Sequence, residues 1–287
     1  MFNALHPTAS PNQFAISYEF FPPKTPEMET QLWQTINRLA ALKPHFVSVT
    51  YGAGGTTRER THSIVARIVR ETEMKPAAHL TCVSAAREDV DAILRDYWDA
   101  GVRHIVALRG DPPTGVGSKF EAHPKGYGTS TDLVSGIRRI ADFEISVSTY
   151  PEGHPESASI EQDLDALQAK VDAGATRAIT QFFFDNDVYF RFLDKARGRG
   201  ITIPIVPGIM PIRNFKQVAG FAQKAGASVP RWLAERFDGL DEDPETRALI
   251  AATTAVEQGM SLARAGVNEL HFYTNKRPDR VCAIGDV

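Results

Sequence analysis

The sequence predicts an α/β fold, a (β/α)8 barrel built as a single domain. Apolar runs rich in β-branched or aromatic residues alternate along the 287 residues with turns and with amphipathic helical patterns. The strand-like run occurs eight times, the number that closes such a barrel. An open doubly wound sheet is the alternative, but the sequence has no G-x-G-x-x-G after its first strand and no G-x-x-x-x-G-K-[ST] motif. The barrel is therefore favoured.

The eight expected strands are short and end at Gly, Pro or polar residues. In chain order they are 14–21 (FAISYEFF), 45–51 (HFVSVTY), 76–82 (PAAHLTC), 104–109 (HIVALR), 144–150 (EISVSTY), 177–184 (RAITQFFF), 202–206 (TIPIV) and 269–274 (ELHFYT).

Helical patterns fill the segments between these strands. Val90, Ile93, Leu94 and Tyr97 follow an i, i+3, i+4, i+7 spacing, and Gly101 stands where a helix ends. A second helix is expected to begin at Ser159, with Gln162 in capping-box spacing, to turn Leu164, Leu167 and Val171 inward, and to end at Gly174. The stretch 213–268 is long enough for two or more helices.

Composition limits the class of protein. With 43% hydrophobic and 23% charged residues the chain can form a full core, and it lacks a signal-peptide pattern and an apolar run of about 18 residues. We therefore expect a soluble, cytoplasmic protein, one domain over 1–287 with an N-terminal extension of about 1–13. The net charge of −3 is scattered, which argues against nucleic acid, and two cysteines exclude a disulfide framework.

Polar or ionisable residues follow almost every expected strand. Because the carboxyl ends of barrel strands meet at one mouth, such residues are candidates for a shared site, although each alone also fits a structural role such as a local ion pair. They are Glu19, Thr50, Tyr51, His79, Thr81, Arg109, Asp111, Tyr150, His154, Gln181, Tyr273 and Arg277.

A metal-dependent hydrolase is one rival interpretation. Glu19, His79, Asp111 and His154 include metal-ligating types, but no H-x-H or H-E-x-x-H spacing occurs, and His104 begins its strand at the wrong end of the barrel. The acidic run 238–245 lacks the calcium-loop pattern and predicts the start of a helix instead. No metal is expected. A non-catalytic barrel that acts as a binding subunit is the second rival.

Ten strings in order resemble bacterial methylenetetrahydrofolate reductases. They span about residues 15–277 and read YEFFPPKT, FVSVTYGAGG, THSI, HLTC, HIVALRGDPP, YPEGHPE, KVDAGATRAITQFFFD, PGIMPI, NFKQ and HFYTNKR. The resemblance implies a (β/α)8 barrel with non-covalent FAD, reduced by NAD(P)H, most often NADH, and reoxidised by 5,10-methylenetetrahydrofolate to give 5-methyltetrahydrofolate. It also implies a homo-oligomer, and the length leaves no room for the regulatory domain of eukaryotic members.

The resemblance also assigns roles to individual residues. Glu19 matches the catalytic acid, and Asp111 is placed near both flavin and pterin. Thr50, Asp111, Gln181, Gln217, Phe221 and Arg277 match the shared folate and nicotinamide site. FAD contacts are implied for Tyr51, Ala53, His79, Arg109, Gly110, Asp111, Tyr127, Tyr150, His154, Ser157, Asp163 and Lys170.

Physical chemistry makes parts of this assignment sensible. Arg109 and Lys170 offer positive charge to a diphosphate, and Gly110 allows a close backbone approach. Two departures from the family concern the FAD site: Ala166 and Ala169 stand where better-known bacterial relatives have polar side chains. The loop 112–130 is longer than the family pattern, so the match of Tyr127 rests on an ambiguous alignment.

The expected chemistry is a hydride relay in which one site serves both substrates in turn. Opening the methylene bridge of the folate requires a proton on the departing N10, and Glu19 is the candidate donor. An acid needs a partly desolvated setting, which Tyr18, Phe20 and Phe21 can supply if they face it; alternate strand residues, however, point to opposite sides. Asp111 is expected to stabilise the cationic iminium form of the folate and to promote hydride donation.

Overall fold

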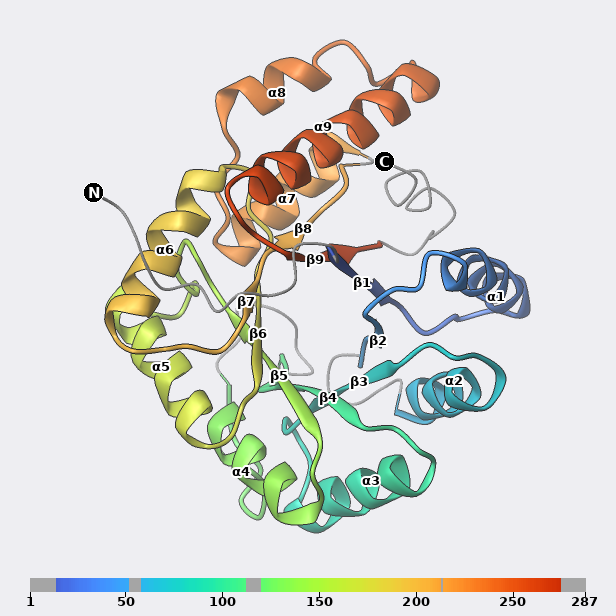
Figure 1. Cartoon of the computed structure of the whole chain (residues 1–287), viewed down its shortest axis with the longest axis vertical. Coiled ribbons are helices and arrows are strands. Elements are labelled where there is room, and N and C mark those ends of the chain that lie inside the picture. Colours follow the sequence, from blue (N-terminus) through green and yellow to red (C-terminus); the bar gives the residue numbers. More distant parts are fainter. Residues whose placement is uncertain (1–13, 52–57, 112–119, 213, 275–287) are drawn as a thin grey trace.

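The computed structural model describes residues 14–51, 58–111, 120–212 and 214–274, which form a nearly closed barrel of parallel strands (Figure 1). The strand order is β7-β6-β5-β4-β3-β2-β1-β9-β8, and the pairs between neighbours in that order are parallel. The strands are β1 Ala15–Phe20, β2 Phe46–Val49, β3 Pro76–Thr81, β4 His104–Leu108, β5 Glu144–Thr149, β6 Arg177–Thr180, β7 Ile205–Val206, β8 Gly208–Ile209 and β9 Glu269–Tyr273. The predicted fold class is confirmed.

The seventh expected strand differs most from its prediction. It lies later than 202–206 and is divided into β7 and β8 by Pro207. Pro207 has no N–H for a ladder, but its carbonyl accepts a 3.0 Å hydrogen bond from the His271 amide. β7 then pairs with β6 while β8 pairs with β9, so this broken strand joins the two ends of the sheet.

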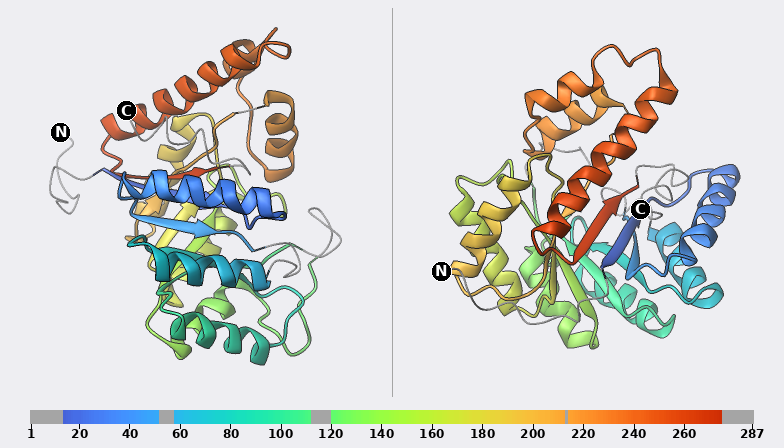
Figure 2. Two further views of the ribbon diagram at one scale, coloured as in Figure 1. Left: turned by 90° about the vertical axis from the view of Figure 1, so that its right-hand side faces the viewer. Right: turned by 45° about the horizontal axis from the view of Figure 1, so that its top comes forward.

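Helices cover the outside of the barrel (Figure 1). Those of the described residues are α1 Pro26–Ala40, α2 Arg58–Glu71, α3 Arg87–Asp99, α4 Ser130–Ile140, α5 Ile160–Asp172, α6 Asn186–Gly198, α7 Phe215–Ala225, α8 Arg231–Phe237 and α9 Pro244–Arg264. Figure 2 shows the last three (orange to red) gathered on one side of the molecule. None of the helices in the described part of the chain is long and apolar enough to cross a membrane.

Local signals fix the ends of the predicted helices. Ser159 caps α5 by accepting a hydrogen bond from the Gln162 amide at 3.3 Å, as the capping-box spacing predicts. Asp243 caps α9 in the same way, so the acidic run 238–245 leads into a helix. Gly101, just after α3, has a φ of +87°, the left-handed conformation that glycine adopts readily.

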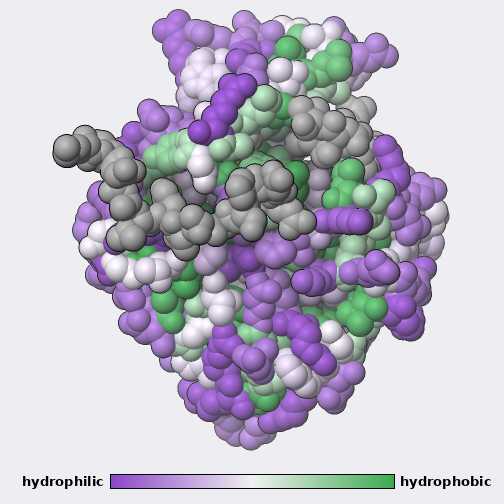
Figure 3. Space-filling view, in the orientation of Figure 1, coloured by the Kyte–Doolittle hydropathy of each residue, from purple (hydrophilic) through white to green (hydrophobic). Residues whose placement is uncertain are grey.

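The core is divided between the barrel interior and the layer under the helices. Tyr18 and Phe20 are 1% exposed and belong to the layer under the helices. Phe46, Ala77, Val106 and Ile179 form a smaller cluster of their own. Because strand residues alternate in direction, the polar residues between the outward-facing ones point into the barrel. Figure 3 shows mainly hydrophilic side chains on the coloured part of one face, with hydrophobic ones in scattered groups.

Candidate active site

A cavity of about 770 Å³ opens at the carboxyl ends of the strands. This is the end at which barrel enzymes place their catalytic groups, because the loops after the strands meet there. Part of the cavity wall is apolar, formed by Val106, Leu108, Val147 and Ile179. Nine of the residues predicted from the sequence line it: Glu19, Thr50, Tyr51, His79, Asp111, Tyr150, Gln181, Phe221 and Tyr273.

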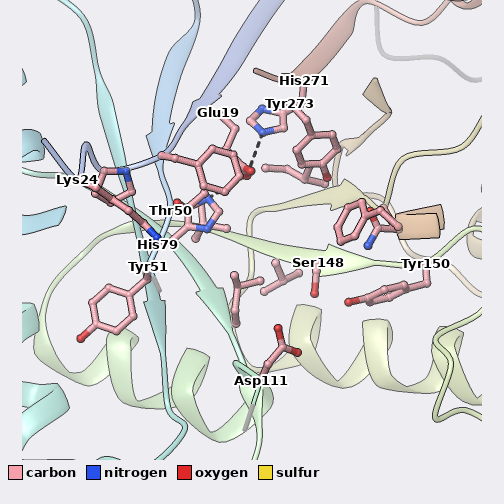
Figure 4. Close-up of a pocket in the computed structure, with 18 of the residues that line it drawn as sticks. Glu19, Lys24, Thr50, Tyr51, His79, Asp111, Ser148, Tyr150, His271 and Tyr273 are labelled. Atoms are coloured by element: carbon pink, nitrogen blue, oxygen red, sulfur yellow. Dashed lines mark ion pairs between the residues drawn. The ribbon is translucent and has the colours of Figure 1, made fainter. Parts of the chain in front are cut away.

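Glu19 lies in the cavity between two histidines (Figure 4). Glu19 is 8% exposed. Its Oε2 lies 3.4 Å from Nε2 of His79 and 3.9 Å from Nε2 of His271. The aromatic neighbours Tyr18 and Phe20 point the other way, under the helices, and only Phe21 of that group lines the cavity. The strand alternation therefore gives Glu19 imidazoles, rather than the adjacent rings in sequence, as its close neighbours.

His79 is a buried, uncharged neighbour for that carboxyl group. Burial lowers the pKa of His79 below its usual value, outweighing the opposing effect of Glu19. Tyr51 also lines the cavity, and burial raises the pKa of its phenol. Near neutral pH both side chains are expected to be neutral, so they can donate or accept hydrogen bonds without adding charge to the cavity.

Sequence reasoning missed His271 and Ser17 as site residues. His271 is 1% exposed in β9 and lines the cavity, and its Nδ1 lies 2.8 Å from Oγ of Ser17 in the neighbouring strand β1. The usable signal was the period of two in ELHFY, which turns Glu269, His271 and Tyr273 to the same side of the strand. Tyr273, noted only as a strand end, donates a 2.7 Å hydrogen bond to the Thr180 carbonyl.

In the segment after β4, Asp111 lines the cavity and Arg109 does not. Asp111 is exposed and lines the cavity, as predicted for a residue near a substrate. Arg109 does not line it; its guanidinium pairs with Glu156 at 2.7 Å. Gly110 has a φ of +86°, and a Cβ there would lie 2.7 Å from a Val83 methyl group. The backbone conformation and the packing of Val83 therefore account for the glycine at position 110 without a bound ligand.

The loop after β5 is fastened to α5 by Asp163. This carboxylate accepts hydrogen bonds from the His154 amide at 2.9 Å and from Oγ of Ser157 at 2.6 Å. The His154 ring meets Tyr150 edge to face, with centroids 4.6 Å apart. Tyr150 lines the cavity, so Asp163 holds the loop that carries a cavity residue.

Lys170 reaches the cavity region from α5. Its Nζ donates a 2.9 Å hydrogen bond to the carbonyl of Ser148, and Ser148 lines the cavity. Burial lowers the pKa of Lys170 to about 8, so its charge can respond to an anion bound nearby. Ala166 and Ala169, the two departures from the family pattern, are exposed on the same helix.

The predicted substrate residues beyond β6 lie on two elements. Gln181 lines the cavity, and its side-chain oxygen accepts a 3.0 Å hydrogen bond from the Phe182 amide. Phe221, 47% exposed, stacks on Phe182 with ring centroids 5.5 Å apart and covers one side of the cavity from α7. Gln217 is exposed one helical turn earlier and is not among the lining residues.

Tyr127 is another predicted residue that does not line the cavity. It is 1% exposed, its hydroxyl donates a 2.6 Å hydrogen bond to Asp91, and Gly136 of α4 packs against its ring. Burial raises the pKa of this phenol to about 12. Ala53 and Arg277 lie outside the described residues.

The described residues contain no group of three His, Cys, Asp or Glu side chains placed to hold a metal ion. His104, which the strand assignment put at the wrong end for such a site, is bonded there to Ser146, with Nε2 and Oγ 2.8 Å apart. The metal-dependent hydrolase thus gains no support from the side chains that the structure describes.

The donor set around the cavity fits a flavin nucleotide. An apolar wall with Tyr51 and Tyr150 suits a flat ring system, and the buried Nε2 of His79 has no hydrogen-bond partner among the described residues. Lys170 and Arg109 supply cationic donors on the β4 and β5 side, as a diphosphate requires. The cavity can therefore bring a ring, an anion and a proton-carrying carboxyl group together.

Comparison with known proteins gives a consistent result. The family model described as methylenetetrahydrofolate reductase matches residues 5–286. The 5,10-methylenetetrahydrofolate reductase of Escherichia coli (strain K12) is 51% identical over 272 residues, covering 95% of this chain and 90% of that protein. Methylenetetrahydrofolate reductase (NADH) 1 of Arabidopsis thaliana is 37% identical, covering 91% of this chain and 46% of the plant protein.

Solved structures agree on the fold. A protein from Clostridium thermocellum, described as binding two copies of 5-methyl-5,6,7,8-tetrahydrofolic acid, superposes with a TM-score of 0.63 at 14% identity. The match covers 95% of this chain and 94% of that one. Dihydropteroate synthase from Xanthomonas albilineans gives a TM-score of 0.52 at 14% identity, covering 96% and 93% of the two chains. At this identity the likeness supports the barrel alone.

Proposed function

Because this chain belongs to the methylenetetrahydrofolate reductase family and reduces 5,10-methylenetetrahydrofolate, we propose that it takes the hydride from NADH by way of bound FAD, in a ping-pong reaction. The observation that carries the proposal is the convergence of Glu19, Asp111 and Gln181, from three separate strands, on one cavity with an apolar wall. Family membership argues against the hydrolase and the non-catalytic subunit considered from the sequence.

FAD, when bound, supplies a group that accepts a hydride from one substrate and gives it to the other. The residues of this chain that would hold it follow or belong to β2, β3, β4 and β5, or lie on α5. Tyr51, His79 and Tyr150 line the cavity and would contact the ring, and Lys170 and Arg109 are the cations available to the diphosphate. Asp163 keeps the loop after β5 in position for this.

Glu19 is the proposed proton donor. The overall reaction consumes one proton along with the hydride, and the proton is needed on N10 of the folate when the methylene bridge opens. Glu19 is the carboxyl group of the cavity that is buried between two imidazoles, whereas Asp111 is exposed. We therefore assign the proton to Glu19 and the stabilisation of positive charge on the folate to Asp111.

NADH is the proposed reductant, which agrees with the name of the plant relative, methylenetetrahydrofolate reductase (NADH) 1. Gln181 and Phe221 both line the cavity and would contact folate and nicotinamide in turn. A homo-oligomer remains a prediction of the family resemblance.

The two half-reactions test this assignment separately. In Glu19→Gln, NADH should bleach the flavin absorbance at close to the normal rate, while reoxidation by methylenetetrahydrofolate should slow by about 100-fold or more, the usual contribution of a general acid. Stopped-flow absorbance measures both steps.

The matched control is Glu88→Gln, which removes an exposed carboxylate on α3. It should leave both half-reactions unchanged. Normal folate reduction by Glu19→Gln would show that another group supplies the proton, and loss of flavin bleaching would show that Glu19 acts on the cofactor instead.

A further inference from the structure

His271 lines the cavity, and neither the sequence prediction nor the comparisons give it a role in the reaction. His271 is 1% exposed at the inner end of the cavity. One ring nitrogen, Nδ1, lies 2.8 Å from Oγ of Ser17, and the other, Nε2, lies 3.9 Å from Oε2 of Glu19. The ring therefore connects a hydroxyl group on one side to the proposed acid on the other.

Ser17 determines which nitrogen of His271 carries the proton. The Ser17 hydroxyl has one hydrogen, and Oγ lies 3.2 Å from the carbonyl of Leu270 in donor geometry. With that hydrogen directed to the carbonyl, the serine oxygen is left as an acceptor, so Nδ1 of His271 must donate to it. A neutral ring with a proton on Nδ1 has a bare Nε2, and Nε2 is the atom that faces Glu19.

A bare Nε2 suits one form of Glu19 only. It repels a carboxylate but accepts a hydrogen bond from a carboxylic acid. In the structure Nε2 has no hydrogen-bond partner among the described residues, and its 3.9 Å separation from Oε2 closes to hydrogen-bond distance with a small side-chain movement. Such bonds are often long in an enzyme without its ligands.

We propose that His271 is a positioning residue for the proposed acid: Ser17 holds the proton on Nδ1, and the bare Nε2 accepts from Glu19 in its protonated form and aims it into the cavity. The inference rests on the proposed function, because it gives Glu19 a proton to donate. When the proton passes from Glu19 to N10, the O–H bond breaks and an N–H bond forms, Glu19 is left as a carboxylate, and a proton from water restores it.

His79 is placed to stabilise the carboxylate form of Glu19. Its Nε2 lies 3.4 Å from the same oxygen of Glu19, so an N–H there can stabilise the carboxylate left after proton transfer. The two histidines thus offer an acceptor before the transfer and a donor after it. The other ionisable groups that line this cavity are Lys24, Tyr51, Asp111, Tyr150 and Tyr273.

Two substitutions of His271 test its two ring nitrogens separately. Asparagine places its amide near the position of Nδ1 and can still bond to Ser17, but it leaves nothing at Nε2. Glutamine reaches the position of Nε2 with an amide oxygen, which is an acceptor. His271→Asn should slow the folate half-reaction about tenfold, equivalent to about 1.4 kcal/mol in the barrier, whereas His271→Gln should retain most of the rate. Flavin reduction by NADH should be unchanged in both.

The proton position can be read without catalysis. ¹⁵N spectra of histidine-labelled holoenzyme, with the His271 signals assigned by their loss in His271→Asn, should show a protonated Nδ1 and a bare Nε2. In Ser17→Ala this preference should weaken, because Nδ1 loses its acceptor. A proton found on Nε2 of His271 in the unsubstituted protein would overturn the inference.

The inference and the proposed function fail in different ways. If Glu19→Gln leaves folate reduction intact, the proton-donor assignment is wrong whatever His271 does. If Glu19→Gln blocks that step while His271→Asn and His271→Gln both proceed normally, Glu19 is the acid and His271 has no part in positioning it. Thermal unfolding and flavin content of each variant show whether it has folded.

Discussion

The two ends of the barrel contain similar histidine and glutamate side chains that are used in opposite ways. At the amino ends of the strands, Arg177 contacts Glu144 and lies 3.2 Å from Glu269, and Glu269 in turn lies 2.9 Å from Nδ1 of His45. At the carboxyl ends, the histidines beside Glu19 have Nε2 atoms with no hydrogen-bond partner among the described residues. One end consists of ionisable groups paired with each other, and the other of groups that face a cavity.

This difference separates stability from function. Removing one member of a buried charge pair destabilises the native state, because the other charge is left buried and alone. Polar groups that face a cavity keep their bonding capacity for a ligand, at some cost in stability. The same residue types, histidine and glutamate, thus serve both purposes, and position along the strand decides which.

The largest loss of stability is expected for a substitution of Arg177, at the amino ends of the barrel strands. Arg177→Met leaves Glu269, whose side chain is 12% exposed, without its guanidinium. Breaking a buried pair in this way costs about 3 to 5 kcal/mol, and the 41% exposure of the Glu144 side chain puts the expectation near the lower value, about 3 kcal/mol. Urea unfolding followed by circular dichroism measures it.

Activity provides the other half of that test. Arg177 begins β6 and is not among the residues that line the cavity, so the folded variant should carry out both half-reactions at normal rates. Arg191→Met, at an exposed arginine of α6, is the matched control and should change neither property. A loss of folate reduction without a loss of stability in Arg177→Met would show that the two ends are not separable.

At the carboxyl ends of the barrel strands, a substitution of Glu19 is expected to reduce activity and to leave stability nearly unchanged. Glu19→Gln should block folate reduction yet change the free energy of unfolding by no more than about 1 kcal/mol, because the ion-pair contacts of the Glu19 carboxyl group with described residues are the long ones to His79 and His271. The same urea titration measures the change. A destabilisation as large as that of Arg177→Met would mean that Glu19 is a structural residue.

The sequence predicted the fold well because the signals that define it are local. Period-two apolar runs located the strands, and cap residues such as Ser159 fixed helix ends. Polar strand ends such as Glu19, Thr50 and His79 predicted the cavity lining, because a barrel brings all such ends together. The seventh strand was placed about three residues early, because Pro204 and Pro207 conceal where its ladder runs.

The partnerships between residues were not predictable in the same way. Ser17 and His271 are joined only because β9 pairs with β1 in one register, which a single sequence does not reveal. Arg109 fits a cofactor contact by its charge, but its partner here, Glu156, comes from the loop after another strand. Tyr127 follows a loop whose length hid the match, and it packs between α3 and α4 instead of at the cavity.

The smallest effect expected is a change in how stability depends on pH. Burial, followed by the charge of Arg177, holds the pKa of His104 well below its usual 6.5. Because the unfolded chain then binds a proton more readily than the folded one, stability is complete above about pH 6.5 and is lost as the pH falls below it, by at most about 1.4 kcal/mol per pH unit for one group.

His104→Gln should reduce this dependence. Glutamine can keep a hydrogen bond to Ser146, the partner of Nε2, and it does not titrate. Between pH 6.5 and 5 its free energy of unfolding should therefore fall less steeply than that of the unsubstituted protein, while at pH 8 the two proteins should differ little. Some dependence should remain, since burial also lowers the pKa of His79 at the other end. If the free energies of unfolding of the two proteins fall in parallel with pH, His104 is not the source of the acid sensitivity. The source would then lie among the cavity residues, and a ligand bound there would change it.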